Sequence, residues 1–228
     1  MNNLPVIKMN DISKSYGRGQ SKVSALSGIS LEVSQGEFVA LLGPSGSGKT
    51  TLMNIIGLMD AADSGEYFLE GTDIIKAKEN AWAKLRNAKI GFVFQKFNLI
   101  PKYNSLYNVA LPLMMQGKTY RKAKEKAKET LERVGLGDRL KHKPSELSGG
   151  QLQRVAIARA LVGGCSLILA DEPTGSLDQK TGGEVLDFMK ELNGEGRTIV
   201  MITHDANIAA RAGRIVRLED GRINERIG

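Results

Sequence analysis

Hydrophobic and polar positions follow two different patterns along this chain. Near the N-terminus, residues 6–17 (VIKMNDISKSYG) and 23–37 (VSALSGISLEVSQGE) alternate apolar and polar residues between Gly and Ser turns, which predicts half-buried antiparallel strands. Later runs are continuously apolar and predict buried strands. These runs are residues 37–43 (EFVALLG), 90–94 (IGFVF), 166–170 (SLILA) and 198–202 (TIVMI). Helical patterns separate the later runs, so a mainly parallel sheet is the economical arrangement.

Residues 96–164 carry mostly helical signals, including the charged run 119–137 (TYRKAKEKAKETLERVGLG), where Gly135 and Gly137 supply helix-stop chemistry. The last residues, 214–228, hold two short strand patterns around Asp220-Gly221, which is a hairpin signal. We therefore expect a single α/β domain over residues 1–228. Its parts are a core of residues 1–95 and 165–228, which contains an N-terminal antiparallel β-subdomain, and an inserted α-helical subdomain of residues 96–164.

Composition narrows the class of protein. The chain has 228 residues, of which 41% are hydrophobic and 25% charged, as in ordinary globular proteins. It has no apolar run long enough to span a bilayer, and its polar start (MNNLPVIKMN) lacks the layout of a secretory signal, so we expect a cytoplasmic protein. The net charge of +7 would favour binding to nucleic acid, an anionic membrane or a nucleotide. The alternative is that it reflects only a basic, solvated surface. The single cysteine, Cys165, is interpreted as structural.

The strongest chemical motif is a glycine-rich loop between a predicted strand and a predicted helix. Residues 43–51 read GPSGSGKTT and match the phosphate-loop pattern in full. In such a loop backbone N–H groups converge on phosphates, Lys49 reaches the β and γ oxygens, and the Thr50 hydroxyl serves Mg²⁺. The motif predicts nucleotide binding by Gly43, Pro44, Ser45, Gly46, Ser47, Gly48, Lys49, Thr50 and Thr51.

Other polar residues follow the predicted buried strands, where an open α/β sheet presents its ligand site. Asp171 is placed to hold Mg²⁺ and Glu172 to polarise the attacking water, although acidic pairs also simply end strands. His204 would donate to the γ-phosphate or to the water, and the Gln95 amide would contact Mg²⁺ or the water. For these two residues, taken alone, a structural role is the alternative.

A second glycine turn opens the predicted helix of residues 147–161 (LSGGQLQRVAIARAL). Free backbone N–H groups and the helix dipole favour an anion at such a turn. The alternative is an ordinary helix cap in which Ser148 accepts from the first turn. Because the chain already has a phosphate loop, this second anion site requires a separate explanation.

These motifs together resemble the nucleotide-binding subunits of ABC transporters. The segments GPSGSGKT, FVFQKFNLIP, LSGGQ, LILADEP and GSLD, with His204, occur in that family's order and spacing over essentially the whole chain. FNLIP and ADEPTGSLD are most similar to the branch of lipoprotein-release, macrolide- and peptide-export and FtsE-type ATPases. The resemblance implies the ABC ATPase fold on a P-loop NTPase core, with ATP and Mg²⁺ bound and ATP hydrolysed to ADP and phosphate.

The resemblance also implies a role for the second glycine turn. Two subunits would pack head to tail, so that the Ser148 turn of one faces the γ-phosphate held by Lys49 of the other. Tyr16 would stack on adenine, and Asp178 would lie in the loop that touches the partner. The roles so implied are catalysis by Glu172, His204, Gln95 and Lys49, metal binding by Thr50, Gln95 and Asp171, and ATP contacts by Ser148, Gly149, Gly150 and Gln151.

The expected partners are a second copy of the chain and integral-membrane permease subunits, which would dock in a groove between Phe97 and Pro112 on the cytoplasmic face of the inner (cell) membrane. Tyr107 stands in LYNV, where the family often has an acidic residue, so it bears on which permease docks. No nucleic acid is expected. The alternatives are a soluble ABC-type ATPase acting on nucleic acid or ribosomes, and a small-molecule kinase, which would leave LSGGQ and Glu172 without a role.

Overall fold

A computed structural model describes residues 5–227. The chain forms two compact units, of which the first comprises Met1–Ala83 with Lys190–Gly228 and the second comprises Lys84–Met189. Two helices, α2 (Glu79–Lys89) and α6 (Gln179–Gly194), continue across the points where the chain passes from one unit to the other. The expected helical subdomain of residues 96–164 falls inside the second unit, and its boundaries stay a prediction.

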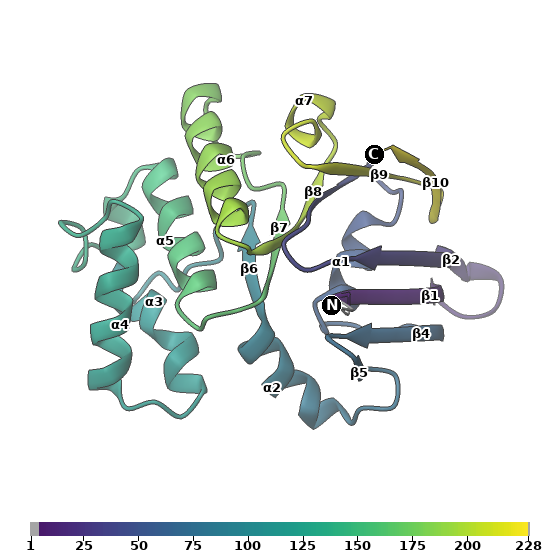
Figure 1. Cartoon of the computed structure of the whole chain (residues 1–228), viewed down its shortest axis with the longest axis horizontal. Coiled ribbons are helices and arrows are strands. Elements are labelled where there is room, and N and C mark those ends of the chain that lie inside the picture. Colours follow the sequence, from purple (N-terminus) through teal and green to yellow (C-terminus); the bar gives the residue numbers. More distant parts are fainter. Residues whose placement is uncertain (1–4, 228) are drawn as a thin grey trace. The chain divides into compact units, whose positions relative to one another are not determined.

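The first unit contains a four-stranded antiparallel sheet, drawn in Figure 1. Its strands are β1 (Ile7–Tyr16), β2 (Val23–Val33), β4 (Ser64–Leu69) and β5 (Thr72–Asp73), in the order β2-β1-β4-β5. Ile7 and Met9 are buried while Lys8 between them is exposed, so the alternation that predicted β1 is confirmed. β4 was not predicted, because its sequence, SGEYFL, does not alternate polar and apolar residues.

The first unit also contains strands with continuous burial. β3 (Phe38–Leu42) pairs in parallel with β8 (Thr198–Thr203) on one side and β9 (Arg214–Glu219) on the other. Every residue of β3 and β8 is buried, as their apolar runs predicted. β10 (Arg222–Ile227) pairs antiparallel with β9 and confirms the predicted hairpin. Two helices follow these strands: α1 (Lys49–Ile56) comes after β3, and α7 (Ala206–Ala209) comes after β8.

In the second unit two parallel strands and a group of helices pack together. β6 (Ile90–Phe94) pairs with β7 (Leu167–Asp171), and the helices are α3 (Ser105–Met115), α4 (Tyr120–Arg133) and α5 (Gly149–Leu161). A Cβ added to Gly91 of β6 would lie 2.7 Å from the carbonyl oxygen of Ala160, so the glycine lets α5 approach the strand. The Cys165 thiol is buried and donates to the Ala160 carbonyl, which agrees with a structural role.

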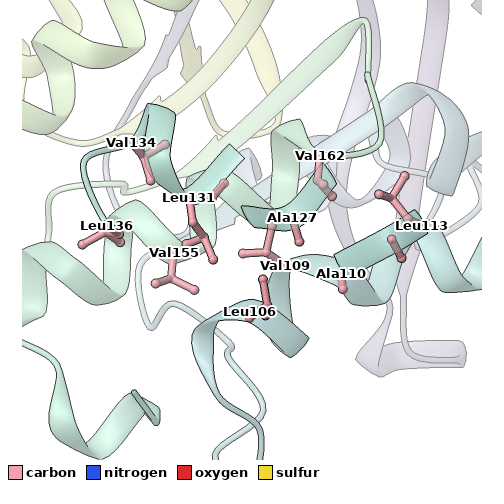
Figure 2. Packing of buried hydrophobic residues seen from close by; sticks show 12 residues of the cluster. Leu106, Val109, Ala110, Leu113, Ala127, Leu131, Val134, Leu136, Val155 and Val162 are labelled. Atoms are coloured by element: carbon pink, nitrogen blue, oxygen red, sulfur yellow. The ribbon is translucent and has the colours of Figure 1, made fainter. Parts of the chain in front are cut away.

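The helices α3, α4 and α5 share one apolar core, shown in Figure 2. Its members include Leu106, Val109, Ala110, Leu113, Ala127, Leu131, Val134, Leu136, Val155 and Val162. Each fully buried Leu or Val of this kind stabilises the fold by about 1.5–3 kcal/mol. The outer face of α4 carries ion pairs such as Arg121–Glu125 and Lys126–Glu129, which is the solvated face of an amphipathic helix. Within residues 5–227 no helix has the length and apolar character needed to cross a membrane.

Candidate functional site

The phosphate loop joins β3 to α1 in the first unit, and its glycines are required by close backbone contacts. A Cβ added to Gly43 would lie 2.1 Å from the carbonyl oxygen of Leu218. A Cβ on Gly48 would lie 2.5 Å from the carbonyl oxygen of Ala25, and Gly48 also has a left-handed φ of 99°. Only glycine fits at either position, so the loop can follow this path only with the observed residues.

The polar groups of this loop are arranged as an anion site. α1 begins at Lys49 with no side-chain cap, which leaves the donors of its first turn for a ligand. Lys49 is a buried residue, and its ammonium donates to the carbonyl oxygens of Gly43 and Pro44, at 2.7 Å each. The Ser47 hydroxyl is buried and has no hydrogen-bond partner among the described residues. An uncapped helix, a folded-back lysine and an unpartnered hydroxyl fit the phosphates of a nucleotide.

The outer part of the loop is open to solvent. Pro44, Ser45, Gly46 and Thr50 are exposed, while Thr51 is half-buried. The Thr50 hydroxyl is therefore accessible at the second residue of α1, where an oxygen donor for Mg²⁺ was predicted.

Tyr16, the expected adenine contact, is the last residue of β1 and is 43% exposed. Its hydroxyl donates to Asp60 Oδ2 at 2.7 Å, and Lys14 Nζ lies 5.3 Å from its ring centroid. Burial, together with the hydrogen bond to Asp60, raises the pKa of the Tyr16 hydroxyl. Lys14 also bonds Asp60 Oδ1 at 2.9 Å, so the three side chains hold one another. The sequence analysis missed Lys14 and Asp60, because no local pattern links residues 44 and 46 positions apart.

His204 leaves the sheet at the same edge as the phosphate loop. Leu42, the last residue of β3, pairs with Thr203 of β8. Gly43 and His204 therefore each come directly after one member of this residue pair. His204 is exposed, and the next residue, Asp205, caps α7 by accepting from the Asn207 N–H at 2.7 Å. The structure thus brings His204 and the phosphate loop together within the first unit.

Gln95 and Glu172 have the same relation in the second unit. Phe94 of β6 pairs with Asp171 of β7, so Gln95 and Glu172 both leave the sheet one residue later. Glu172 has a φ of 45°, which is uncommon for a residue other than glycine. The Ser176 hydroxyl donates to the Gln95 carbonyl at 2.9 Å, and a Cβ on Gly175 would lie 2.6 Å from Gln95 Nε2. The loop after Glu172 therefore packs directly on Gln95.

The second glycine turn is a capping box at the start of α5. The Ser148 hydroxyl accepts from the Gln151 N–H at 3.4 Å, and Gln151 Oε1 accepts from the Ser148 N–H at 3.0 Å. In the first of these bonds the hydroxyl only accepts, so its own O–H can still donate to an anion. The helix-cap alternative correctly described the hydrogen bonds of this turn, and it does not exclude an anion there.

The same turn lies against the loop that carries Asp178. A Cβ on Gly149 would be 3.2 Å from Leu177 Cδ2, and one on Gly150 would be 2.4 Å from Thr181 Cγ2. Asp178 accepts from the Thr181 N–H at 3.0 Å, and its hydrogen bonds with Thr181 lower the pKa of its carboxyl. The second unit contains all of these predicted residues, and its segment of residues 172–181, which includes Asp178, contacts Gln95 at one end and the Ser148 turn at the other.

The expected magnesium ligands, Thr50, Gln95 and Asp171, belong to different units, Thr50 to the first and the other two to the second. All of them offer oxygen donors, which is the chemistry that Mg²⁺ prefers, alongside substrate phosphates. The described part of the chain holds no group of three or more His, Cys, Asp or Glu residues that could bind a metal by itself.

Comparisons with known proteins agree with these motifs. A family model described as ABC transporter matches residues 26–175. The chain is 51% identical over 218 residues to YvrO of Bacillus subtilis, an uncharacterized ABC transporter ATP-binding protein, covering 96% of this chain and 95% of that protein. It is 50% identical over 228 residues to the macrolide export ATP-binding/permease protein MacB of Syntrophobacter fumaroxidans, covering 99% of this chain but 32% of that protein.

Solved structures show the same fold. The dimeric post-hydrolysis state of the ATP-binding cassette MJ0796, bound to ADP and Pi, is similar with a TM-score of 0.88 and 42% identity over 97% of both chains. A further structure, cbiO1 from Clostridium perfringens, part of the transporter complex cbiONQ, has a TM-score of 0.86 at 27% identity, covering 97% of this chain and 88% of that one. The predicted α/β cassette fold is confirmed.

Proposed function

This chain belongs to the ABC transporter family and is an ATP-binding subunit of such a transporter, and on that premise we propose that it hydrolyses ATP as a homodimer and thereby drives a membrane permease. The observation that carries the proposal is the phosphate loop, with its uncapped α1, its folded-back Lys49 and the glycines that leave no room for a Cβ. The relation to a cassette described as a post-hydrolysis dimer with ADP and Pi supports hydrolysis and dimerisation.

Within one chain, the first unit binds the nucleotide. Backbone N–H groups of residues 45–51 hold the phosphates, and the Lys49 ammonium exchanges its two loop carbonyls for β and γ oxygens. Tyr16 stacks on adenine with the ring face opposite Lys14, and this contact accepts any purine because every base has a π face. The Thr50 hydroxyl would offer an oxygen to Mg²⁺ beside the phosphates, with Gln95 and Asp171 as its other proposed ligands, and the ion would supply positive charge that neutralises the phosphate oxygens.

The reacting water is prepared by residues at strand ends. Glu172 acts as general base and takes a proton from the water as it attacks the γ-phosphate. Its left-handed φ of 45° supports this role, because such backbone strain in non-glycine residues is concentrated at functional sites. His204 donates a hydrogen bond to the γ-phosphate, and the Gln95 amide orients the water.

The site becomes complete only in the dimer. The Ser148 turn of one protomer contacts the γ-phosphate bound by the phosphate loop of its partner, with Asp178 in the loop beside it. A two-fold axis repeats this arrangement, so two ATP molecules hold the pair together. Hydrolysis removes the phosphate that both chains contact, and the dimer therefore relaxes after each turnover.

The permease docks on the segment from Phe97 to Pro112 as a short helix in a groove. The relation to MacB, which is described as a macrolide export ATP-binding/permease protein, supports a membrane permease as partner and work in export. Lipoprotein release and mechanotransmission are the other kinds of work proposed from the resemblance of the motifs. The subunit then lies on the cytoplasmic face of the inner membrane. Charged substitutions at Phe97 and Leu99 should abolish co-purification with the permease, whereas unchanged co-purification would contradict this docking site.

The second candidate function is a soluble ABC-type ATPase acting on nucleic acid or ribosomes. The observation that favours it is the clustering of charge, because residues 102–143 hold eleven Lys or Arg against four Asp or Glu, equal to the whole excess of +7. Stimulation of ATP hydrolysis by permease in membranes, and not by DNA or RNA, would decide for the transporter subunit.

The central experiment measures ATP hydrolysis against protein concentration in the presence of Mg²⁺. If each site uses groups of two chains, the rate per chain should rise with concentration until the dimer is saturated. Sedimentation velocity at the same concentrations should show a dimer with Mg-ATP and a monomer with ADP. Full hydrolysis by a species that stays monomeric throughout would contradict the proposal.

A further inference from the structure

Two consecutive residues just after Gln95 have a left-handed backbone. Phe97 has a φ of 58° and Asn98 a φ of 49°. Asparagine tolerates this conformation, but a bulky residue such as phenylalanine rarely adopts it. Their own amides bond only to nearby carbonyls, Phe97 N–H to Phe94 and Asn98 N–H to Lys96. Something outside the loop must therefore stabilise this conformation.

The Arg159 guanidinium provides that stabilisation from α5. Its Nη1 donates to the Asn98 carbonyl at 2.6 Å and its Nη2 to the Phe97 carbonyl at 2.9 Å. The planar fork of an arginine can make both bonds only if the two carbonyls point the same way. Arg159 is half-buried within the otherwise buried run of residues 155–161, and burial lowers the pKa of its guanidinium. Among the described residues no carboxylate lies within ion-pair distance of it.

A second side chain holds the far end of the same segment. The buried Asn108 of α3 accepts from the Ile100 N–H at 2.8 Å, and its amide donates to the carbonyl oxygens of Ile100 at 3.2 Å and Tyr103 at 3.0 Å. Residues 97–104 are thus held between α5 and α3, all within the second unit. The segment forms no regular helix or strand, and these two side chains hold its backbone together with Leu99, which packs against the helical core.

We propose that Arg159 is a positioning residue that makes two parts of the second unit move as one body. These parts are the Gln95 loop (residues 95–104) and helix α5, which begins at the Ser148 turn. This inference rests on the proposed function, in which Gln95 contacts the γ-phosphate site of its own chain and Ser148 that of the partner. Displacement of residues 97–104 by a docked permease then shifts the Ser148 turn through Arg159. The reverse also holds, because coupling between two sites is reciprocal.

The first test replaces the planar guanidinium of Arg159 and keeps its positive charge. Arg159→Lys retains a cation, but one ammonium cannot hold two consecutive carbonyls in the arginine geometry. Hydrogen exchange should become about tenfold faster for the amides of residues 95–104 and stay unchanged in the core residues Val109–Leu113. Arg139→Lys is the matched control, because Arg139 pairs with Asp138 and His142 on the surface of the same unit.

The kinetic readout separates positioning from general damage. In Arg159→Lys the turnover of ATP should fall about tenfold, while the Kd for ATP stays within about twofold, because the nucleotide-binding loop lies in the other unit. A merely structural role would lower the amount of folded protein and leave turnover per folded molecule unchanged. Titration calorimetry and the steady-state rate measure the two quantities.

A second pair of variants leaves α5 intact in case Arg159→Lys fails to fold. Asn98 is exposed, so Asn98→Val changes no core contact but strongly disfavours the left-handed backbone. It should reproduce both the faster exchange and the lower turnover. Asn98→Gly is its matched control for the backbone, because glycine adopts a positive φ freely, and the exchange of residues 95–104 should stay close to that of the natural chain.

Unchanged exchange of residues 95–104 in both Arg159→Lys and Asn98→Val would overturn the stabilising role of Arg159. Faster exchange with unchanged turnover would overturn the coupling. If the natural chain hydrolysed no ATP at all, the proposed function would fall, and the exchange data would still confirm or overturn the role of Arg159 in holding the loop.

Discussion

The chain opens two helices on glycine turns, and the two turns differ in how their donors are used. α1 begins after Gly48 with no side-chain cap, and Lys49 folds back onto the loop carbonyls. α5 begins after Ser148 with a reciprocal capping box between Ser148 and Gln151. The first turn therefore presents its donors to a ligand in advance, whereas the second satisfies its own donors until a ligand displaces them.

This difference indicates two roles in binding phosphate. A turn whose backbone donors have no side-chain cap binds a polyanion by itself, because no cap must be displaced and Lys49 only exchanges two carbonyls for phosphate oxygens. A self-capped turn gains less from an anion and is suited to sense a phosphate that another site already holds. The comparison predicts that α1 determines ATP affinity and that α5 determines dimerisation and turnover.

The largest effect is expected from Glu172→Gln, which removes the general base and leaves both turns intact. Turnover should fall about a thousandfold, because general-base catalysis contributes on the order of 10²–10⁴. ATP should still bind, and the uncleaved γ-phosphate should hold the dimer, visible by size-exclusion chromatography with Mg-ATP. Glu191→Gln, an exposed position of α6, is the control. A monomer at saturating ATP would argue against the shared site.

Lys49→Ala tests the role of the open turn. The Kd for ATP should rise about tenfold to a hundredfold, because a hydrogen bond from a charged group contributes about 1.5–3 kcal/mol. Titration calorimetry measures this directly, with Lys8→Ala on the exposed side of β1 as a control. An unchanged Kd would mean that the phosphate loop does not determine affinity, and the contrast between the turns would fail.

Ser148 variants test the self-capped turn. Ser148→Ala should lower the stability by about 1 kcal/mol through loss of the cap. Ser148→Asp keeps a capping oxygen, so its melting temperature should match the natural chain, but its charge repels the partner's γ-phosphate. Turnover should fall about tenfold or more in Ser148→Asp while the Kd for ATP of the single chain stays within about twofold. Normal turnover in this variant would leave the turn with a capping role only.

The smallest effect is expected at the base of the nucleotide. Tyr16→Ala should raise the Kd for ATP about tenfold, since stacking of a base on an aromatic ring contributes about 1–3 kcal/mol. Tyr16→Phe keeps the ring and loses only the bond to Asp60, so its Kd should rise by less than about threefold. Equal losses in the two variants would show that the hydroxyl, and not ring stacking, carries the contact.

Local patterns predicted most of the framework because the relevant forces act between near neighbours. Continuous apolar runs identified β3, β6, β7 and β8, and Asp220-Gly221 identified the β9–β10 hairpin. The phosphate loop and the Ser148 turn were identified from glycine spacing, because glycine permits backbone contacts that other residues exclude. The roles of Tyr16 and Asp178 came from family resemblance and remain predictions.

The sequence by itself therefore determined most of the elements, the glycine turns and the chemical groups at the strand ends, while β4, β5 and α2 were not predicted. Only the tertiary structure decided which of these groups support one another. Tyr16 and Asp60 are 44 positions apart, Arg159 and Asn98 are 61 apart, and Ser176 and Gln95 are 81 apart. No periodic pattern of side chains links positions so distant, because such contacts form only when the sheets and helices pack. The sequence shows Arg159 only as a single arginine within the apolar run of residues 155–161. Its partners could not be predicted, because they are backbone carbonyls, which every residue has.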